Sequence, residues 1–252
     1  KKYYFEKKSL LKAGVDACYN GKYFIRAITD DGTVLGDEKS AECKIDLLTQ
    51  AYAAISGIAN KEKALSAVEY AEKMLVDEKN GIIKLLDPPF EHSENVGYIA
   101  DYPPGIRENG GQYTHAAVWF VYALYELGQM EKAFKYLNML NPVEHYQKYD
   151  GKVYGAEPYV MSADVYSGEN AGKAGWSWYT GSASWMYVAM IKKLFGIEIK
   201  NGVVSFSPNL PSSLDKAAVA VRYDGKTLTV NIENDNPDGE WRIVYGGVEY
   251  NT

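Results

Sequence analysis

Apolar residues recur at helical spacing through most of the first 195 residues. In the segment 40–57, Ile45, Leu48 and Ala51 are three residues apart, with further apolar positions beside them. Such spacing gathers apolar side chains on one face of a helix. The pattern predicts helices at 7–18, 40–57, 61–75, 114–127, 130–140 and about 180–195. Paired helices with functional loops at one end are typical of an α/α toroid.

A long loop is predicted between residues 78 and 111. It contains the pairs Pro88-Pro89 and Pro103-Pro104, and proline interrupts regular structure because it lacks a backbone N–H. Loops of this length inside a compact domain are usually functional. We therefore expect this loop to form a wall of the functional site.

After Gly196 the pattern changes to short β-prone runs separated by turn residues. These runs cover 203–206, 217–223, 227–232 and 241–245, with Asp-Gly and Asn-Asp-Asn-Pro-Asp-Gly turns between them. Alternating strands and turns of this kind predict antiparallel hairpins. The sequence thus divides into a helical part, residues 1–198, and a small β domain, residues 199–252.

The charge balance excludes one class of partner. The net charge is -6, and no basic stripe is visible, whereas nucleic acids are held by clustered lysines and arginines. No apolar run reaches the roughly 20 residues of a membrane helix, and no cleavable signal pattern opens the chain. A cytoplasmic enzyme without nucleic-acid or membrane partners is expected.

Neither the cysteines nor the histidines predict a cofactor site. Cys18 and Cys43 lie in apolar helical contexts and are expected to be buried free thiols. Three scattered histidines offer no metal-ligand spacing. The glycines match neither a dinucleotide fingerprint nor a phosphate-binding loop of the Walker type.

Two segments carry the candidate chemistry. Residues 102–115 read Tyr-Pro-Pro-Gly-Ile-Arg-Glu-Asn-Gly-Gly-Gln-Tyr-Thr-His, and residues 176–185 read Trp-Ser-Trp-Tyr-Thr-Gly-Ser-Ala-Ser-Trp. Both open into an apolar helix. Polar, charged and glycine residues at a helix start suit an anion, and aromatic faces suit sugars. A site for a sugar and a phosphate is indicated.

With these segments the chain resembles the inverting glycoside phosphorylases of glycoside hydrolase family 94. That family holds cellobiose and chitobiose phosphorylases and the phosphorylase end of cyclic β-1,2-glucan synthases. Within the motif at 103–115, the chain looks more like the β-1,2-glucan branch. Matching landmarks follow in order at 30–36, 42–50, 85–90, 107–115, 141–142, 157–160, 163–166 and 176–185.

The resemblance implies both a fold and a reaction. The fold would be mainly α, the second half of an (α/α)6 barrel, followed by an antiparallel β-sandwich. The reaction would cleave a β-glucosidic bond of a gluco-oligosaccharide with inorganic phosphate, with inversion, to give α-glucose 1-phosphate. Phosphate is the co-substrate, and no cofactor is implied.

One family motif is missing from this chain. The general acid of the family is an aspartate within Trp-Asn-Asp-Gly, and no Asp-Gly pair here follows Trp-Asn. The chain therefore reads as the C-terminal part of a longer enzyme whose acid lies upstream of Lys1. Half a toroid would leave apolar helix faces uncovered, so the expected partners are the missing N-terminal part or a second copy.

The resemblance also assigns residues. His115, Thr180 and Gly181 correspond to phosphate ligands, at the starts of two predicted helices where N–H groups favour an anion. Glu108 corresponds to a residue that accepts hydrogen bonds from acceptor-sugar hydroxyls. The same subsite would be bordered by Arg107, Gln112 and Tyr113.

These assignments have structural alternatives. Thr180 could simply cap its helix, and Glu108 could pair with Arg107. Trp185 is assigned to the core, and Trp176 and Trp178 equally to core or site wall. Glu42, Asp46 and Gln50 fall on successive turns of one predicted helix and are interpreted as scaffold contacts beneath the site. Glu157 and Asp164 stand among aromatic and apolar residues, where either a perturbed pKa or a structural hydrogen bond to a loop backbone is expected. His92 and His145 are interpreted as loop or surface residues.

Two other functions stay open on the sequence. An inverting α/α-barrel glycoside hydrolase would use a water and a general base in place of phosphate. Alternatively, the chain could be a catalytically inactive half-barrel that binds a sugar or phosphate, because it lacks the acid.

Overall fold

The computed structural model describes residues 2–94, 96–178, 181–235, 241–245 and 247–251. The predicted phosphate ligand Thr180 therefore lies outside the described residues. The helices are α1 Lys2–Ala17, α2 Leu47–Ile55, α3 Lys61–Leu75, α4 Thr114–Glu126, α5 Met130–Leu140, α6 Pro142–His145, α7 Gly151–Tyr154 and α8 Gly181–Ala189. Short 3₁₀ helices span Gly97–Asp101 and Gly168–Asn170, and π-helical turns span Tyr146–Asp150 and Met190–Leu194.

The strands are short in the helical part and longer near the C-terminus. Those of the helical part are β1 Ala27–Ile28, β2 Val34–Leu35, β3 Ile45–Asp46, β4 Val76–Asp77, β5 Ile82–Ile83, β6 Leu86–Asp87, β7 Gln112–Tyr113 and β8 Asp164–Val165. The C-terminal strands are β9 Ile197–Lys200, β10 Val203–Phe206, β11 Lys216–Tyr223, β12 Lys226–Glu233, β13 Arg242–Tyr245 and β14 Val248–Asn251.

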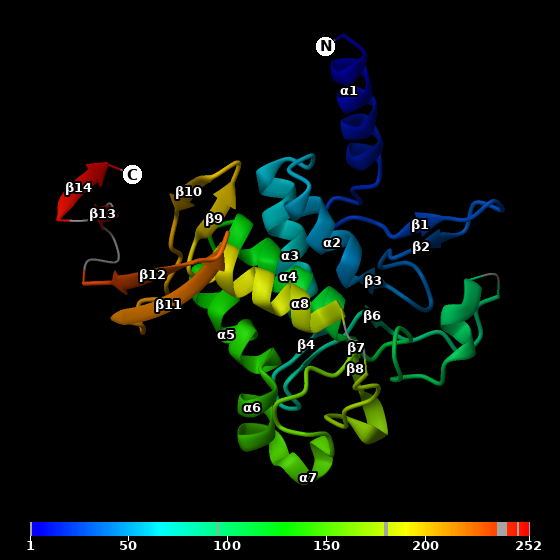
Figure 1. Ribbon diagram of the computed structural model, residues 1–252. Coiled ribbons are helices and arrows are strands. Elements are labelled where there is room, and N and C mark those ends of the chain that lie inside the picture. The colour runs from blue at the N-terminus through cyan, green and yellow to red at the C-terminus, as the bar shows by residue number, and fades with distance from the viewer. Residues whose placement is uncertain (1, 95, 179–180, 236–240, 246, 252) are drawn as a thin grey trace.

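Helix α4 occupies the centre of the molecule. Its sequence, THAAVWFVYALYE, is apolar on nearly every face, and a helix of that kind must be covered on all sides. It packs against α2, α5 and α8, which surround it in Figure 1. Phe120 and Val121 at its middle are completely buried. The main hydrophobic core is therefore built around this helix.

Several helices match the sequence prediction closely, and one does not. Helices α3 and α5 have the predicted bounds. The helix expected at 40–57 begins only at Leu47, because Cys43 has a left-handed backbone with φ 46° and Asp46 caps the helix by accepting the Thr49 N–H. The residues before Leu47 instead form turns and β3.

The segment 142–154 was not predicted to be helical, yet it forms α6, a π-helical turn and α7. Its helical pieces are too short for an apolar period to be recognised. Pro142 stands in the first turn of α6 after the capping residue Asn141, where its missing N–H costs nothing. In Figure 1 this segment extends away from the central helices.

The C-terminal part consists of antiparallel hairpins, as the sequence predicted. β9 pairs with β10, β11 with β12, and β13 with β14. The β11–β12 turn contains Asp224 and Gly225, both with positive φ, as a two-residue hairpin turn requires. The first hairpin begins at Ile197, so the division expected after residue 198 falls within β9.

An apolar groove of about 790 Å³ runs between α1 and α2. Leu10 and Leu11 of α1 line it while remaining 73% and 57% exposed. Tyr52 and Ala53 of α2 form its opposite side. These two helices thus present an uncovered apolar face. None of the helices, over the residues searched, is long and apolar enough to cross a membrane.

We predict that the isolated chain associates through this groove. Burying one leucine side chain contributes about 1.5–3 kcal/mol, so Leu11→Glu should weaken self-association about tenfold or more. Sedimentation velocity over a range of concentrations measures this. Val203→Glu, at a site 67% exposed on β10, is the matched control. A monomer at every concentration, or equal effects of both variants, would contradict the prediction.

Candidate functional site

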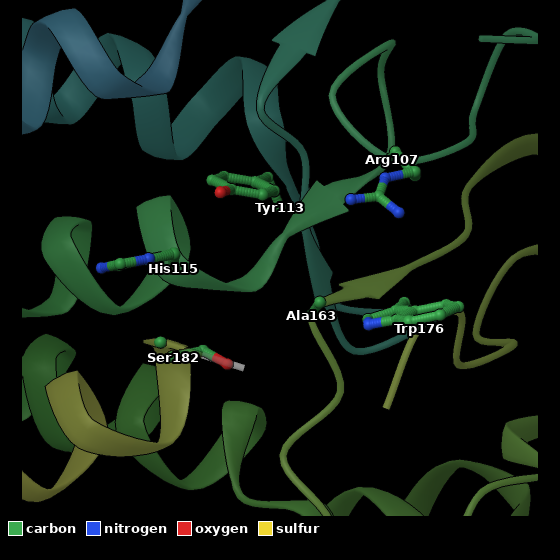
Figure 2. A pocket seen from close by; sticks show the side chains of 7 residues that line it. Arg107, Tyr113, His115, Ala163, Trp176 and Ser182 are labelled. Atoms are coloured by element: carbon green, nitrogen blue, oxygen red, sulfur yellow. The ribbon is translucent and has the colours of Figure 1, made fainter. Parts of the chain in front are cut away.

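A cavity of about 240 Å³ lies where α4, α8 and the loops before them meet. Figure 2 shows His115 and Ser182 on the two helices, and Arg107 and Trp176 approaching from the other side. The cavity is lined by Arg107, Tyr113, His115, Ala163, Trp176, Gly181 and Ser182. Residues from both sequence segments with candidate chemistry thus meet at one place.

The start of α4 is fixed by a short strand pair. β7 runs directly into α4 and pairs with β8, Tyr113 opposite Asp164. The Thr114 N–H, which has no partner inside its helix, donates to the Ala163 carbonyl at 2.9 Å. These bonds hold Tyr113, at the end of β7, and His115, in the first turn of α4, beside the Ala163 segment.

His115 packs against the first residue of α8. A Cβ on Gly181 would lie 3.0 Å from Cε1 and 3.2 Å from Nδ1 of the imidazole, so glycine permits the close approach. Trp119, one helical turn on, covers the ring at 4.3 Å between centroids. The structure therefore brings His115 and Gly181 together, as a shared anion site requires.

Two buried polar atoms at this junction have no hydrogen-bond partner among the described residues. His115 Nε2 and Ser182 Oγ make no hydrogen bond in the described part of the chain, and Ser182 is only 1% exposed. Buried polar groups are normally satisfied. Both atoms stand in the first turns of helices, where free N–H groups also favour a negative charge. The junction therefore suits an anion.

Ser182 was missed by the sequence analysis. Its position directly after Thr180 and Gly181, in the first turn of a predicted helix, was the available signal. A serine there is as easily read as part of the helix surface, and only the packing of α8 against α4 buries it.

Arg107 brings a positive charge to the cavity from a constrained backbone. Its φ is 50°, an uncommon conformation for a residue with a side chain. Its guanidinium lies 5.4 Å from the centre of the Tyr102 ring and its Nε lies 3.6 Å from Glu108 Oε2. The ion pair between Arg107 and Glu108 that the sequence left as an alternative is therefore present.

Glu108 is mostly covered, with its side chain 13% exposed. Besides the ion pair, its Oε2 atom has no hydrogen-bond partner among the residues that the structure describes. The carboxylate retains capacity to accept a hydrogen bond, so the ion pair and the predicted contact with a sugar hydroxyl are compatible.

Gln112 is bonded to the scaffold. Its Oε1 accepts the Ile83 N–H at 2.9 Å, and its Nε2 donates to Thr114 Oγ1 at 3.3 Å. It is 3% exposed and lies outside the cavity lining. Tyr113 does line the cavity, and burial raises the pKa of its hydroxyl.

The long loop before β7 is anchored by the buried side chain of Asn109. Its Oδ1 accepts the Phe90 N–H at 2.7 Å, and its Nδ2 donates to the carbonyls of Phe90 and Tyr102. This one amide side chain thus makes hydrogen bonds to three backbone groups of the loop. The expectation that this loop walls the site agrees with Arg107 lining the cavity.

The residues expected to be scaffold contacts do serve that role, though not on one helix. Gln50 bonds the Phe24 backbone at 2.9 and 2.8 Å. Asp46 pairs with Arg26 and caps α2. Glu42 accepts the backbone N–H groups of residues 91–93. Only Gln50 lies within α2, so the expectation of successive turns of one helix was wrong.

The other histidines differ from each other. His92 is exposed, as expected, but His145 is 4% exposed, which corrects its interpretation as a loop or surface residue. The centre of its ring lies 4.9 Å from the ring centres of both Tyr149 and Tyr154. The sequence could not show this because the three residues meet only through the unpredicted helical segment.

The core assignment of Trp185 agrees with its packing. The centre of its ring lies 5.5 Å from that of Trp119 and 6.1 Å from that of His115. Trp176 is 44% exposed and lines the cavity, whereas Trp178 is 72% exposed. Trp176 therefore belongs to the site wall.

Within the part of the chain that the structure describes, no three His, Cys, Asp or Glu side chains are grouped so that they could hold a metal ion. Both cysteines are free, Cys43 buried and Cys18 partly buried.

We predict that His115 and His145 titrate below the ordinary histidine pKa of 6.5, because burial disfavours the charged imidazolium. The unfolded chain would then bind these protons more readily, so stability should fall as pH drops from about 6.5 through the folded values. Proton NMR, with His→Gln variants for assignment, measures both pKa values. Midpoints at or above 6.5 would refute the prediction.

Two sequence models of known families match this chain. A sequence model of the glycosyl hydrolase 94 superfamily catalytic domain matches residues 1–196, and one of the glycosyl hydrolase family 65 C-terminal domain matches residues 197–236.

Similar curated proteins include a synthase and several phosphorylases. Cyclic beta-(1,2)-glucan synthase NdvB of Rhizobium meliloti is 41% identical over 92% of the chain. Cellobionic acid phosphorylase of Neurospora crassa is 29% identical over 89% of the chain. N,N'-diacetylchitobiose phosphorylase of Vibrio proteolyticus is 26% identical over 85%. The chain spans only 8%, 30% and 27% of these proteins, respectively.

The resemblance seen in the sequence motifs is confirmed by these matches. Since the catalytic-domain match extends over residues 1–196 of the chain, the protein belongs to the glycosyl hydrolase 94 superfamily.

Proposed function

We propose that this chain supplies the phosphate and acceptor-sugar sites of an inverting glycoside phosphorylase. The enzyme cleaves a β-glucosidic bond with inorganic phosphate and releases α-glucose 1-phosphate. The observation that carries the proposal is the cavity at which His115, Gly181, Ser182 and Arg107 meet. It offers an imidazole, two helix starts, a hydroxyl and a guanidinium to one anion.

Phosphorolysis places particular demands on such a site. Inverting hydrolysis needs a carboxylate base to activate water, whereas phosphate is already anionic and needs only to be held beneath the anomeric carbon. Preformed donors do this and also stabilise charge in the transition state. A neutral His115 still donates from one ring nitrogen, so its lowered pKa is compatible with the role.

The composition of the cavity favours phosphorolysis over hydrolysis. Within the described residues, the side chains that line it include a cation, an imidazole and hydroxyls but no carboxylate. An inverting hydrolase would need a base at this position. This supports phosphate as the attacking group.

The acceptor sugar would bind on the Arg107 side of the cavity. Trp176 offers an aromatic face there, and the Glu108 carboxylate can accept a sugar hydroxyl. Gln112 contributes indirectly, by fixing the strand before His115. The 41% identity to a protein named as a β-(1,2)-glucan synthase favours a β-linked gluco-oligosaccharide as the substrate class.

The general acid would come from the remainder of a longer polypeptide. No Trp-Asn-Asp-Gly motif occurs in this sequence, and the matched phosphorylases are more than three times as long as the region they share with it. In this proposal, residues 1–198 form the second half of an (α/α)6 barrel, and residues 199–252 form part of a β-sandwich. The remaining helices would cover the α1–α2 groove.

A binding protein without catalysis is the second candidate, and the missing acid motif is the observation that favours it. Activity separates the two. The full-length enzyme should release α-glucose 1-phosphate from a β-linked gluco-oligosaccharide only when phosphate is present. The chain alone should be inactive, because general acid catalysis contributes roughly 10²- to 10⁴-fold. Glucose release without phosphate would support a hydrolase, and turnover by the chain alone would show that it contains an acid.

For the phosphate site, we predict that His115→Ala and Ser182→Ala in the full-length enzyme raise the KM for phosphate about ten- to a hundredfold. Each removes a hydrogen bond to a charged group, worth roughly 1.5–3 kcal/mol. Gly181→Ala should act similarly, because its methyl group would press on the imidazole. Thr180→Ala should behave like Ser182→Ala if the resemblance holds.

His92→Ala is the control for these variants, because it removes an exposed histidine outside the cavity lining. It should not change the KM for phosphate. Unchanged phosphate kinetics in the His115 and Ser182 variants would remove the basis for the proposed site.

A further inference from the structure

Asp164 carries a buried carboxylate that lies behind the cavity wall. Asp164 is 1% exposed and is absent from the described residues that line the cavity. Its Oδ1 accepts the Trp176 N–H at 2.9 Å. Its Oδ2 is buried and makes no hydrogen bond within the described residues. One oxygen of this carboxylate thus accepts a backbone hydrogen bond, although burying a charged group is costly.

The neighbours of Asp164 are the residues that form the wall. Ala163 precedes it, Tyr113 is its partner across the β7–β8 pair, and Trp176 is bonded to its side chain. All three line the cavity. Asp164 is therefore the point at which three wall segments are joined.

The chain around Trp176 is shaped to admit this carboxylate. The Gly175 N–H donates to the Asp164 carbonyl at 2.8 Å. A Cβ on Gly175 would lie 2.3 Å from Oδ2 and 2.5 Å from Oδ1, closer than any real contact. Only glycine lets the backbone of residues 175–176 reach the side chain, so the strand and the Trp176 segment are fitted to each other.

The charge of Asp164 also acts on the cavity. Burial raises the pKa of Asp164, the Trp176 N–H and the charge and backbone N–H of nearby Arg107 lower it, and the Glu108 carboxylate raises it. Arg107 is paired directly with Glu108 at 3.6 Å, and the Asp164 carboxylate adds a further electrostatic attraction on it.

We propose that Asp164 is a positioning residue that fixes Trp176 at the cavity through its hydrogen bond to the Trp176 backbone and attracts Arg107 electrostatically. It acts through these two residues and does not touch a ligand. The inference rests on the proposed function of the cavity as a phosphate and acceptor site, and it adds a specific cause for the geometry of its wall.

Two substitutions separate the bond from the charge. Asp164→Asn retains an oxygen for the Trp176 N–H but loses the charge, and Asp164→Ala loses both. In the full-length enzyme we expect Asp164→Ala to raise the KM for phosphate and for the acceptor sugar about tenfold, with a smaller effect on kcat. Asp164→Asn should recover the part due to the bond.

Hydrogen exchange gives a readout that does not depend on activity. The Trp176 amide should exchange faster in Asp164→Ala than in the wild type, and at nearly the wild-type rate in Asp164→Asn. The control Asp37→Asn alters a loop carboxylate that accepts the Lys39 N–H and an Asn20 amide but lies outside the cavity lining. It should change neither the KM values nor the Trp176 exchange.

The outcomes distinguish the inference from the proposed function. If the wild-type enzyme shows no phosphate-dependent reaction, the proposed function fails, while Trp176 exchange still tests the positioning role. If the enzyme is active and both Asp164 variants keep wild-type KM values and exchange, the inference is wrong. Should Asp164→Ala fail to fold, Asp164→Asn decides alone: its Trp176 exchange is expected at nearly the wild-type rate, so wild-type KM values for phosphate and the acceptor sugar would overturn the proposal.

Discussion

Burial of α4 is the constraint on which the rest of the structure depends. A helix that is apolar on nearly every face is stable only when other elements cover it, and α2, α5 and α8 do so. Because α8 is one of these elements, its first turn is brought against the first turn of α4. The contact of His115 with Gly181 is thus a consequence of hydrophobic packing, which positions two helix starts where an anion can use both.

The cavity combines this packing with a rigid wall on its opposite side. Buried amides and a carboxylate satisfy the backbone of irregular segments: Asn109 binds the long loop, Gln112 binds Ile83, and Asp164 binds Trp176. Without such partners, loops so close to the core would leave unsatisfied polar groups, which is costly. The wall is therefore held by side chains that a ligand never needs to contact.

The apolar groove between α1 and α2 is not covered in this way. Leu10 and Leu11 are exposed on α1, although apolar side chains of this size are usually covered in a stable assembly. The core around α4 is thus buried within the described residues, whereas this apolar face of α1 and α2 is exposed.

The sequence by itself determined the main elements and the family. The apolar period located α3 and α5 because long, regular helices carry a repeating signal, and Asp224-Gly225 located a hairpin because that turn requires left-handed residues. Only the tertiary structure decided that Gln112 accepts the Ile83 N–H, that His145 is buried, that Ser182 lines the cavity and that Asp164 accepts the Trp176 N–H. Those properties depend on contacts between residues distant in sequence, such as Asp164 with Trp176 and Gln112 with Ile83, and periodicity carries no information about them.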